Sequence, residues 1–351
     1  MARAINGGWQ LAADHGANRR AAGEVVDDLL QLAEAGFTTF DGADIYLGVE
    51  ELFGALQRRW RALGRALDAL QIHTKYVPDR SSLAAVDRRA VERAIDRSLS
   101  RLGAERLDLV QFHWWDFEVA GWIEAASALD ALHRAGKIRA VGVTNFDTVH
   151  LTALLDAGVA VVSNQVQYSL LDRRPERAMS ALCAERDIHL LCYGSLAGGL
   201  LSERWLGREA PQVGAMANRS LTKYRLIVDE AGGWVAYQGL LAALAVVARR
   251  HRVSAANVAA RWVLDRPAVG AVILGAPSGS GDPLADPGAS HLEENRRLFE
   301  FELEPEDRAA IDRALEACPS PPGDPYELER RPGGRHAAIL RTEQHAAGGE
   351  R

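Results

Sequence analysis

One pattern recurs eight times along this chain: a short run of apolar, β-type residues, a loop rich in glycine or polar residues, and an amphipathic helix. The apolar runs cover residues 4–9, 37–41, 71–75, 108–113, 140–145, 161–165, 189–193 and 268–275. The helical segments between them, such as 21–36 and 86–103, carry apolar residues every three or four positions and end at a glycine. Alternating strands and helices imply a parallel sheet, and eight such strands close most naturally into a (β/α)8 barrel.

A doubly wound α/β sheet is the alternative fold. It would be favoured by a G-x-G-x-x-G turn after the first strand, and the sequence contains no such turn. A length of 351 residues suits one barrel of about 250 residues with extensions. We therefore predict a single barrel domain over residues 1–318, with a long connection at 205–233 after the seventh strand. The Pro/Gly-rich, charged segment 319–351 is expected to be a packed extension that ends in disorder.

Composition excludes several classes of function. The chain is 48% hydrophobic and 25% charged, as a globular protein is, and a net charge of -6 gives no basic surface for nucleic acid. The longest apolar run, 239–248, is too short to span a bilayer, and residues 1–16 lack the apolar core of a signal peptide, so we expect a cytoplasmic protein. Its three cysteines are widely spaced, which argues against a disulfide framework or a structural zinc site. The oligomeric state cannot be read from these features.

In a (β/α)8 barrel the catalytic groups lie at the carboxyl ends of the strands. The second run ends at Asp41, with Tyr46 in the loop that follows, the third ends at Lys75 and the fourth at His113. Strand alternation lets these ends point toward the barrel axis, and it places His73 on the same face as Lys75. Four ionisable groups would then surround one mouth.

This set of groups suits carbonyl chemistry. A phenol has a reference pKa near 10, so Tyr46 needs a nearby cation such as Lys75 to release its proton near neutral pH. Asp41 would hold Lys75 in place, and His113 could orient a carbonyl oxygen or relay a proton. The combination fits protonation of a carbonyl oxygen while a nicotinamide cofactor delivers hydride. A barrel metallohydrolase that uses Asp41, His73 and His113 as ligands is an alternative.

Seven motifs in order, from about Gly7 to Leu315, resemble the aldo-keto reductase family: FDGADIY, HTKY, RLGAERLDLVQFHWWD, GKIRAVGVTNFD, SNQVQYSLL, YGSLAGGLLS and HLEEN. The resemblance implies a barrel that binds extended NADP(H) without a Rossmann fold and reduces aldehydes or ketones, or runs the reverse reaction. It implies that Tyr46 donates the proton and that Asp41, Lys75 and His113 complete the catalytic set. No metal is implied.

The same resemblance implies binding residues at the other strand ends. Thr144, Asn145 and Gln165 would hydrogen-bond the nicotinamide carboxamide, and Tyr193 would stack on its ring. The pyrophosphate would lie on the turn after the seventh strand, at Gly194, Ser195, Leu196 and Gly198, and the adenine at Glu294 and Asn295. Three aromatic residues would line the substrate mouth: Trp9, Tyr76 and Trp114.

The resemblance favours NADP(H) over NAD(H), but Pro277 and His291 stand where relatives often have Lys or Arg. Arg219, Lys223 and Arg225 lie in the long segment 202–234, which we expect to be a mobile cover over the cofactor, and they could replace those missing cations. The alternative interpretation of residues 202–234 is a basic helix face that is exposed to solvent. A non-catalytic, nicotinamide-binding regulatory or scaffold subunit of the same fold also stays open as an alternative function.

Overall fold

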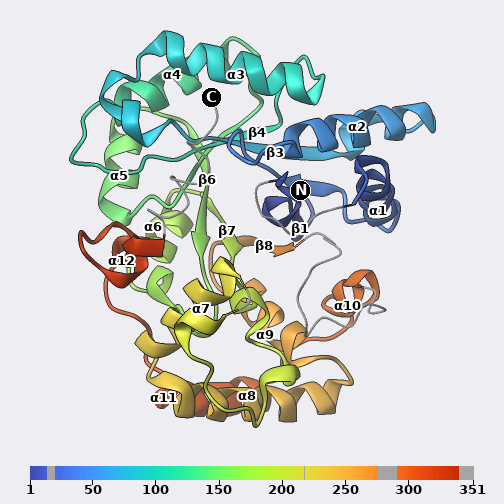
Figure 1. Ribbon diagram of the computed structural model, residues 1–351, viewed down its shortest axis with the longest axis vertical. Helices are drawn as coiled ribbons and strands as arrows, with labels where there is room; N and C mark the ends of the chain where they lie inside the picture. Colours follow the sequence, from blue (N-terminus) through green and yellow to red (C-terminus); the bar gives the residue numbers. More distant parts are fainter. Residues whose placement is uncertain (14–19, 217, 276–290, 340–351) are drawn as a thin grey trace.

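The computed structural model describes residues 1–13, 20–216, 218–275 and 291–339, and within them eight parallel strands form a closed barrel in sequence order (Figure 1). The strands are β1 (Ala4–Gly7), β2 (Thr39–Asp41), β3 (Gln71–Tyr76), β4 (Leu109–Phe112), β5 (Val141–Thr144), β6 (Val161–Gln167), β7 (His189–Tyr193) and β8 (Val269–Gly275). β1 pairs with β8, which closes the barrel. The predicted (β/α)8 fold is confirmed.

Helices cover the outside of the barrel. They are α1 (Ala22–Glu34), α2 (Val49–Ala62), α3 (Arg88–Leu102), α4 (Trp122–Arg134), α5 (Thr148–Asp156), α6 (Met179–Glu185), α7 (Arg219–Glu230), α8 (Gly233–His251), α9 (Ala255–Leu264), α10 (His291–Arg297), α11 (Pro305–Glu316) and α12 (Glu327–Arg330). No single helix of the described residues is long and apolar enough to cross a membrane, although α7 and α8 together, bent by 98°, meet that test.

The predicted helix at 86–103 shows how the local sequence sets its ends. The Asp87 side chain caps α3 by accepting a hydrogen bond from the Ala90 amide at 2.7 Å, and Gly103 ends it in the left-handed region at φ 63°. The first predicted strand, 4–9, stops at Gly7 and gives way to a 3-10 turn, Trp9–Leu11, while the sixth extends two residues further than predicted, to Gln167. Differences of this size at strand ends are expected, since the apolar pattern does not mark the last paired residue.

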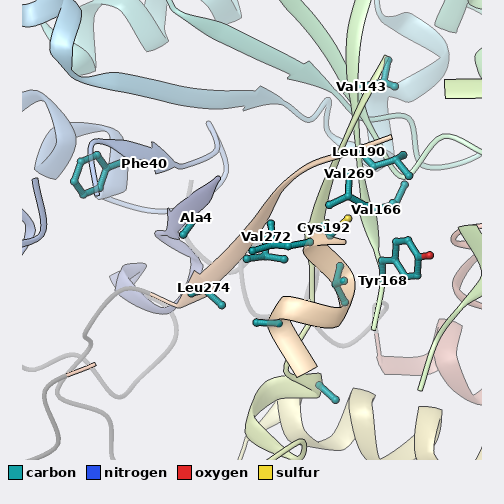
Figure 2. Close-up of a cluster of buried hydrophobic side chains, with 14 of the residues drawn as sticks. Ala4, Phe40, Val143, Val166, Tyr168, Leu190, Cys192, Val269, Val272 and Leu274 are labelled. Atoms are coloured by element: carbon teal, nitrogen blue, oxygen red, sulfur yellow. The ribbon is translucent and has the colours of Figure 1, made fainter. Parts of the chain in front are cut away.

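Alternate residues on each strand point to opposite sides of the barrel wall. The outward side chains, among them Phe40, Val166, Cys192 and Val272, pack into the main hydrophobic cluster beneath the helices (Figure 2). A separate, smaller cluster consists of Ile5, Leu109, Leu191 and Ala271. Each of these four precedes the carboxyl end of its strand, so apolar residues fill the lower part of the barrel and the strand ends above can be polar.

Gly142 shows how tightly the interior is packed. A Cβ atom added there would lie 2.4 Å from the Ser163 Oγ atom and 3.4 Å from the Leu109 Cδ1 atom. Both distances are shorter than or at the limit of ordinary contact, so only glycine fits at this point of β5.

The described residues of the two segments outside the regular repeat pack against the rest of the protein. The long connection after β7 is present, and it contains short 3-10 turns and the 12-residue helix α7, capped by Asn218. Residues 319–339 pack back onto the barrel: Ser320 accepts a hydrogen bond from the Arg173 amide at 3.0 Å, and Asp324 accepts one from the Thr148 amide at 2.6 Å. The expected disorder concerns residues 340–351, which lie outside the described residues.

Candidate active site

A buried hydrogen-bonded network joins the ends of β2, β3, β4 and β6. The Lys75 Nζ atom donates to Asp41 Oδ2 at 2.5 Å and to the Gly42 carbonyl oxygen at 2.8 Å. The second Asp41 oxygen accepts from the side-chain amides of Gln111, at 2.7 Å, and Gln165, at 2.9 Å. Burying two charges is costly unless they are paired and hydrogen-bonded, and here both conditions are met. Asp41 and Lys75 therefore lie together as predicted.

Tyr46 lies in the turn between β2 and α2, and its ring faces this pair. The Lys75 Nζ atom is 5.1 Å from the ring centroid. The turn is fixed by its own backbone, since the Tyr46 amide donates to the Ala43 carbonyl oxygen and the Val49 amide donates to that of Tyr46, both at 3.0 Å. The ammonium is thus held against the face of the Tyr46 ring.

His113 follows β4 and is buried. Its Nδ1 atom lies 3.2 Å from the Thr144 carbonyl oxygen, an acceptor, so Nδ1 carries the ring proton. Its Nε2 atom is buried and has no hydrogen-bond partner in the structure. Burial, followed by the charge of Arg330, lowers the pKa of His113 to about 3. At neutral pH the ring is neutral and presents an Nε2 lone pair.

The metallohydrolase alternative required His73 as a ligand with Asp41 and His113. No group of three His, Cys, Asp or Glu side chains that could hold a metal ion occurs in the described part of the chain. The Asp41 carboxylate instead faces Lys75 and two amides. The arrangement of Asp41 fits a structural anchor for a cation better than a metal ligand.

The strand ends opposite carry the predicted nicotinamide residues. Asn145 has a left-handed backbone, with φ 60°, and its Oδ1 atom accepts a hydrogen bond from the Tyr193 hydroxyl at 2.8 Å. The Thr144 hydroxyl donates to the Gln165 carbonyl oxygen at 3.1 Å. Because the Gln165 amide nitrogen is engaged with Asp41 and with Gln111, its amide oxygen is the atom left to face a carboxamide. The structure thus brings Thr144, Asn145, Gln165 and Tyr193 together.

The turn after β7 has the features of an anion cradle. Gly194 and Gly198 have positive φ angles of 68° and 65°, and the Ser195 hydroxyl is buried without a partner in the structure. Leu196 packs against the main core. A Cβ at Gly194 would lie 2.5 Å from the Tyr224 hydroxyl, so helix α7 lies directly over this turn. Successive backbone amides with a hydroxyl suit a phosphate oxygen.

Helix α7 brings Lys223 to the site but not Arg225. The Lys223 Nζ atom lies 4.8 Å from the centroid of the Tyr193 ring. Arg225 forms an ion pair with Asp229 and donates to the Pro211 carbonyl oxygen, so its guanidinium is held within the α7 region. Of the three cations proposed in this segment, Lys223 is the one that contacts a predicted cofactor residue.

The predicted adenine residues lie on α10. The Ser254 hydroxyl donates to Glu294 at 2.7 Å and also caps α9, which ties α10 to that helix. Asn295 is half-buried on the same helix. Pro277 lies outside the described residues, so the structure does not bear on that position.

The family model for the aldo/keto reductase family matches residues 3–316. The chain belongs to the aldo/keto reductase family. Curated relatives include flagellar radial spoke protein 5 of Chlamydomonas reinhardtii, 30% identical over 64% of this chain and 49% of that protein. Methylglyoxal reductase YeaE of Escherichia coli is 27% identical over 83% of each chain, and the chloroplastic pyridoxal reductase of Arabidopsis thaliana is 29% identical over 68% and 67%. The match thus spans about half the length of the radial spoke protein.

Solved structures share the fold of this aldo/keto reductase. The glycerol dehydrogenase AKR11B4 from Gluconobacter oxydans superimposes with a TM-score of 0.71 at 23% identity and covers 92% of this chain and 94% of its own. The aldo/keto reductase from Klebsiella pneumoniae, solved in complex with NADP and acetate, gives a TM-score of 0.65 at 23% identity, with the same coverages.

Two of the three aromatic residues predicted for the substrate mouth are buried in the core. Trp114 is fully buried, and its ring packs 5.8 Å from that of Phe112 in the core. Tyr76 is also buried and stacks on the same Phe112 ring at 5.9 Å. Trp9 is half-buried in the turn after β1. Trp115, three residues after the end of β4, contacts the His113 ring, with ring centroids 4.5 Å apart.

The C-terminal segment adds residues that the sequence did not reveal. The Tyr326 ring lies 5.7 Å from the His113 ring, edge to face. Arg330 donates to the carbonyl oxygens of Asn145, at 2.8 Å, and Trp114, at 2.9 Å. These residues lie beyond the part that the family model matches, and they contact strands more than 180 positions earlier in the chain. No local sequence signal could have placed them.

Proposed function

We propose that this protein is an NAD(P)H-dependent oxidoreductase that reduces the carbonyl group of aldehydes or ketones to an alcohol, or catalyses the reverse. The observation that carries the proposal is the Tyr46 ring held 5.1 Å from a buried Lys75 ammonium that Asp41 fixes in place. Two relatives named as reductases of methylglyoxal and pyridoxal support it, since both names denote carbonyl substrates.

The residues present fit a nicotinamide cofactor. The buried, unpartnered Ser195 hydroxyl and the positive-φ glycines beside it suit the pyrophosphate. Thr144, Asn145 and the Gln165 amide oxygen suit the carboxamide, and Tyr193 offers a ring face. When bound, the cofactor supplies or accepts a hydride at the carbonyl carbon.

The protein's own side chains donate the proton and bind the oxygen of the substrate's carbonyl group. Tyr46 gives its phenolic proton to the carbonyl oxygen, and Lys75 stabilises the phenolate that remains. Asp41, itself held by two glutamine amides, fixes the Lys75 ammonium against the Tyr46 ring. A neutral His113 with its proton on Nδ1 can only accept at Nε2, so it binds a hydroxyl, either the alcohol or a water that returns the proton to Tyr46.

NADP(H) is the cofactor form that we propose in preference to NAD(H), with Arg219 and Lys223 as candidate partners of the 2'-phosphate. The substrate is a small molecule in either case, and a cytoplasmic location remains a prediction. The decisive experiment is a fluorescence titration of the purified protein with NADPH and with NADH, followed by turnover of an aldehyde panel. Binding and turnover support the proposal; tight cofactor binding without turnover of any aldehyde or alcohol contradicts it.

A nicotinamide-binding subunit without turnover is the second candidate. It is favoured by the relative named flagellar radial spoke protein 5, a name that denotes a component of a larger assembly. The same titration separates the two, because this candidate predicts cofactor binding that no carbonyl substrate consumes.

A further inference from the structure

Arg330 is a cation fixed beside the catalytic mouth. Its Nη1 atom donates to the Asn145 carbonyl oxygen at 2.8 Å, its Nη2 atom to that of Trp114 at 2.9 Å, and its Nε atom lies 3.4 Å from that of Trp115. Two aromatic rings lie against the guanidinium: its Cζ atom is 4.3 Å from the centroid of Phe117 and 5.0 Å from that of Tyr326. The guanidinium is therefore rigid, partly buried and oriented.

This guanidinium has hydrogen-bond partners but no counter-ion. Among the residues that the structure describes, no carboxylate lies within 4 Å of Arg330. The neighbouring Glu329 is paired with Arg174 at 3.0 and 3.2 Å, and Asp147 accepts hydrogen bonds from the amide and ring nitrogens of His150. Backbone carbonyls satisfy N–H groups but carry no net charge, so one positive charge is left over at the mouth.

The electrostatic consequences are visible at the neighbouring groups. Arg330 contributes, after burial, to the low pKa of His113, and burial lowers the pKa of Arg330 itself. Lys75, the other cation acting on His113, is compensated by Asp41 at 2.5 Å. Arg330 is thus a cation without a paired carboxylate among the described residues at this side of the mouth.

We propose that Arg330 binds an anionic group of the substrate, so that the preferred substrates are carbonyl compounds that also carry a carboxylate. A guanidinium has five N–H donors, and three are used in the contacts above, which leaves two for a carboxylate. The Tyr326 ring contacts both the His113 ring, at 5.7 Å, and the guanidinium, at 5.0 Å. A substrate whose carboxylate lies a few bonds from the reacting carbonyl can therefore reach Arg330 while its carbonyl lies at His113. The proposal rests on the proposed function and names its substrate class.

The test compares benzaldehyde with its 2-, 3- and 4-carboxy derivatives as substrates of the full-length protein saturated with reduced cofactor. Charge-assisted hydrogen bonds predict a kcat/KM about 10- to 100-fold higher for the best carboxylated isomer than for benzaldehyde. Arg330→Met keeps an apolar stem between the two rings and removes the charge. It should abolish the preference, so that kcat/KM for the best carboxylated isomer falls about 10- to 100-fold relative to kcat/KM for benzaldehyde. Arg330→Lys should keep part of the preference.

Arg331→Met is the matched control. Arg331 is exposed at the next position and pairs only loosely with Glu327, at 3.5 Å, so its loss should leave the preference intact. Equal kcat/KM for charged and neutral aldehydes in the unmodified protein overturns the proposal. So does an Arg330→Met variant that loses both activities equally, or one that weakens cofactor binding with the preference unchanged, because the guanidinium is then a structural anchor or a phosphate ligand.

A binding measurement keeps the inference testable without variants and without turnover. Benzoate and benzamide have nearly the same shape and differ in charge, so the protein saturated with cofactor should bind benzoate at least about tenfold more tightly, and added salt should reduce the difference. If no aldehyde is turned over, the proposed function fails while this comparison still stands. Equal affinity for the two overturns the anionic subsite itself.

Discussion

The buried Lys75–Asp41 pair is hard to explain by stability alone. Replacing a buried ion pair by apolar residues is often neutral or stabilising, because desolvation of two charges offsets much of their attraction. Here Lys75 also donates a hydrogen bond to the Gly42 carbonyl oxygen, and Asp41 accepts hydrogen bonds from Gln111 and Gln165. The ammonium lies against the face of the Tyr46 ring. The arrangement therefore fits a proton-transfer site, and its parts can be tested one residue at a time.

Tyr46→Phe should leave the fold and cofactor affinity intact and lower carbonyl reduction by roughly 10²- to 10⁴-fold, the usual contribution of a general acid. The ring keeps its place over Lys75, and only the proton donor is lost. Steady-state kcat with a saturating aldehyde measures the effect. A variant with more than a tenth of the normal turnover would mean that another group protonates the carbonyl oxygen.

Lys75→Met should be nearly as damaging, because it removes the cation that stabilises the phenolate and leaves the Asp41 carboxylate buried without its partner. The Tyr46→Phe/Lys75→Met double variant should be hardly slower than either single variant, since residues that act as a unit are not additive. Single-turnover rates of all three proteins test this. Multiplicative losses would show that the two residues act independently.

Strand alternation explains which site residues the sequence could reveal. Asp41 ends β2, Lys75 is the last residue but one of β3 and His113 directly follows β4, so alternation places all three on the inner face. The same rule, applied one residue further, puts Tyr76 and Trp114 on the outer face, where both pack against Phe112. Their assignment to the substrate mouth stays a prediction, and their burial in the core argues against it. Gln111 lies on the inner face by the same alternation, but nothing local indicated that it would bond to Asp41.

At the scale of elements, α7 covers the turn after β7 that we propose as the pyrophosphate site. Its Tyr224 lies against Gly194 and Gly198, and its Lys223 lies over Tyr193. We predict that NADPH protects residues 212–232 from hydrogen exchange, and that Lys223→Ala weakens NADPH binding roughly ten- to a hundredfold and NADH binding less. Arg225→Ala, which breaks the Asp229 pair instead, is the control for helix stability. If hydrogen exchange in residues 212–232 is the same with and without NADPH, α7 is a fixed structural helix that does not respond to the cofactor.

The C-terminal segment is held by a charge cluster that no local pattern could predict. Arg174 is fully buried between Asp172 and Glu329, and the latter lies 155 positions away in the chain. Burial opposes ionisation of Glu329, but the nearby Arg174 and Lys223 charges prevail and lower its pKa to about 2. The sequence shows a charged tail here, and only the tertiary fold pairs it.

Arg174→Met should release this segment from the barrel. It leaves two carboxylates buried without their cation, which typically costs about 3 to 5 kcal/mol of unfolding free energy. Urea unfolding measures the loss, and hydrogen exchange in residues 324–338 should rise more than in the barrel strands. Arg186→Met, which breaks an exposed pair with Glu185, should change stability by less than about 1 kcal/mol. If the two substitutions lower the unfolding free energy equally, the buried cluster around Arg174 does not hold the C-terminal segment.

For the whole molecule, the eightfold repeat was sufficient to predict the closed barrel, because each strand and helix carries its own periodicity. The ionisation state of the barrel interior was not predictable in this way, since it depends on how deeply each group is buried. Both histidines of the interior show this. Burial lowers the pKa of His113 to about 3, and burial, partly opposed by Asp41, lowers that of His73 from 6.5 to about 4.

These pKa values predict a loss of stability in mild acid. Above pH 6.5 His73 is neutral in the folded and the unfolded chain; between pH 6.5 and 4 the unfolded chain binds a proton there and the folded protein does not, so unfolding becomes easier as pH falls. By pH 5 the His73 contribution amounts to about 2 kcal/mol. His73→Gln, a neutral polar replacement, should therefore lose about 2 kcal/mol less than the unmodified protein between pH 7.5 and pH 5 in urea unfolding. His189→Gln, at an exposed position of β7, should follow the unmodified curve. Parallel curves for the unmodified protein and His73→Gln would show that His73 is protonated in the folded barrel.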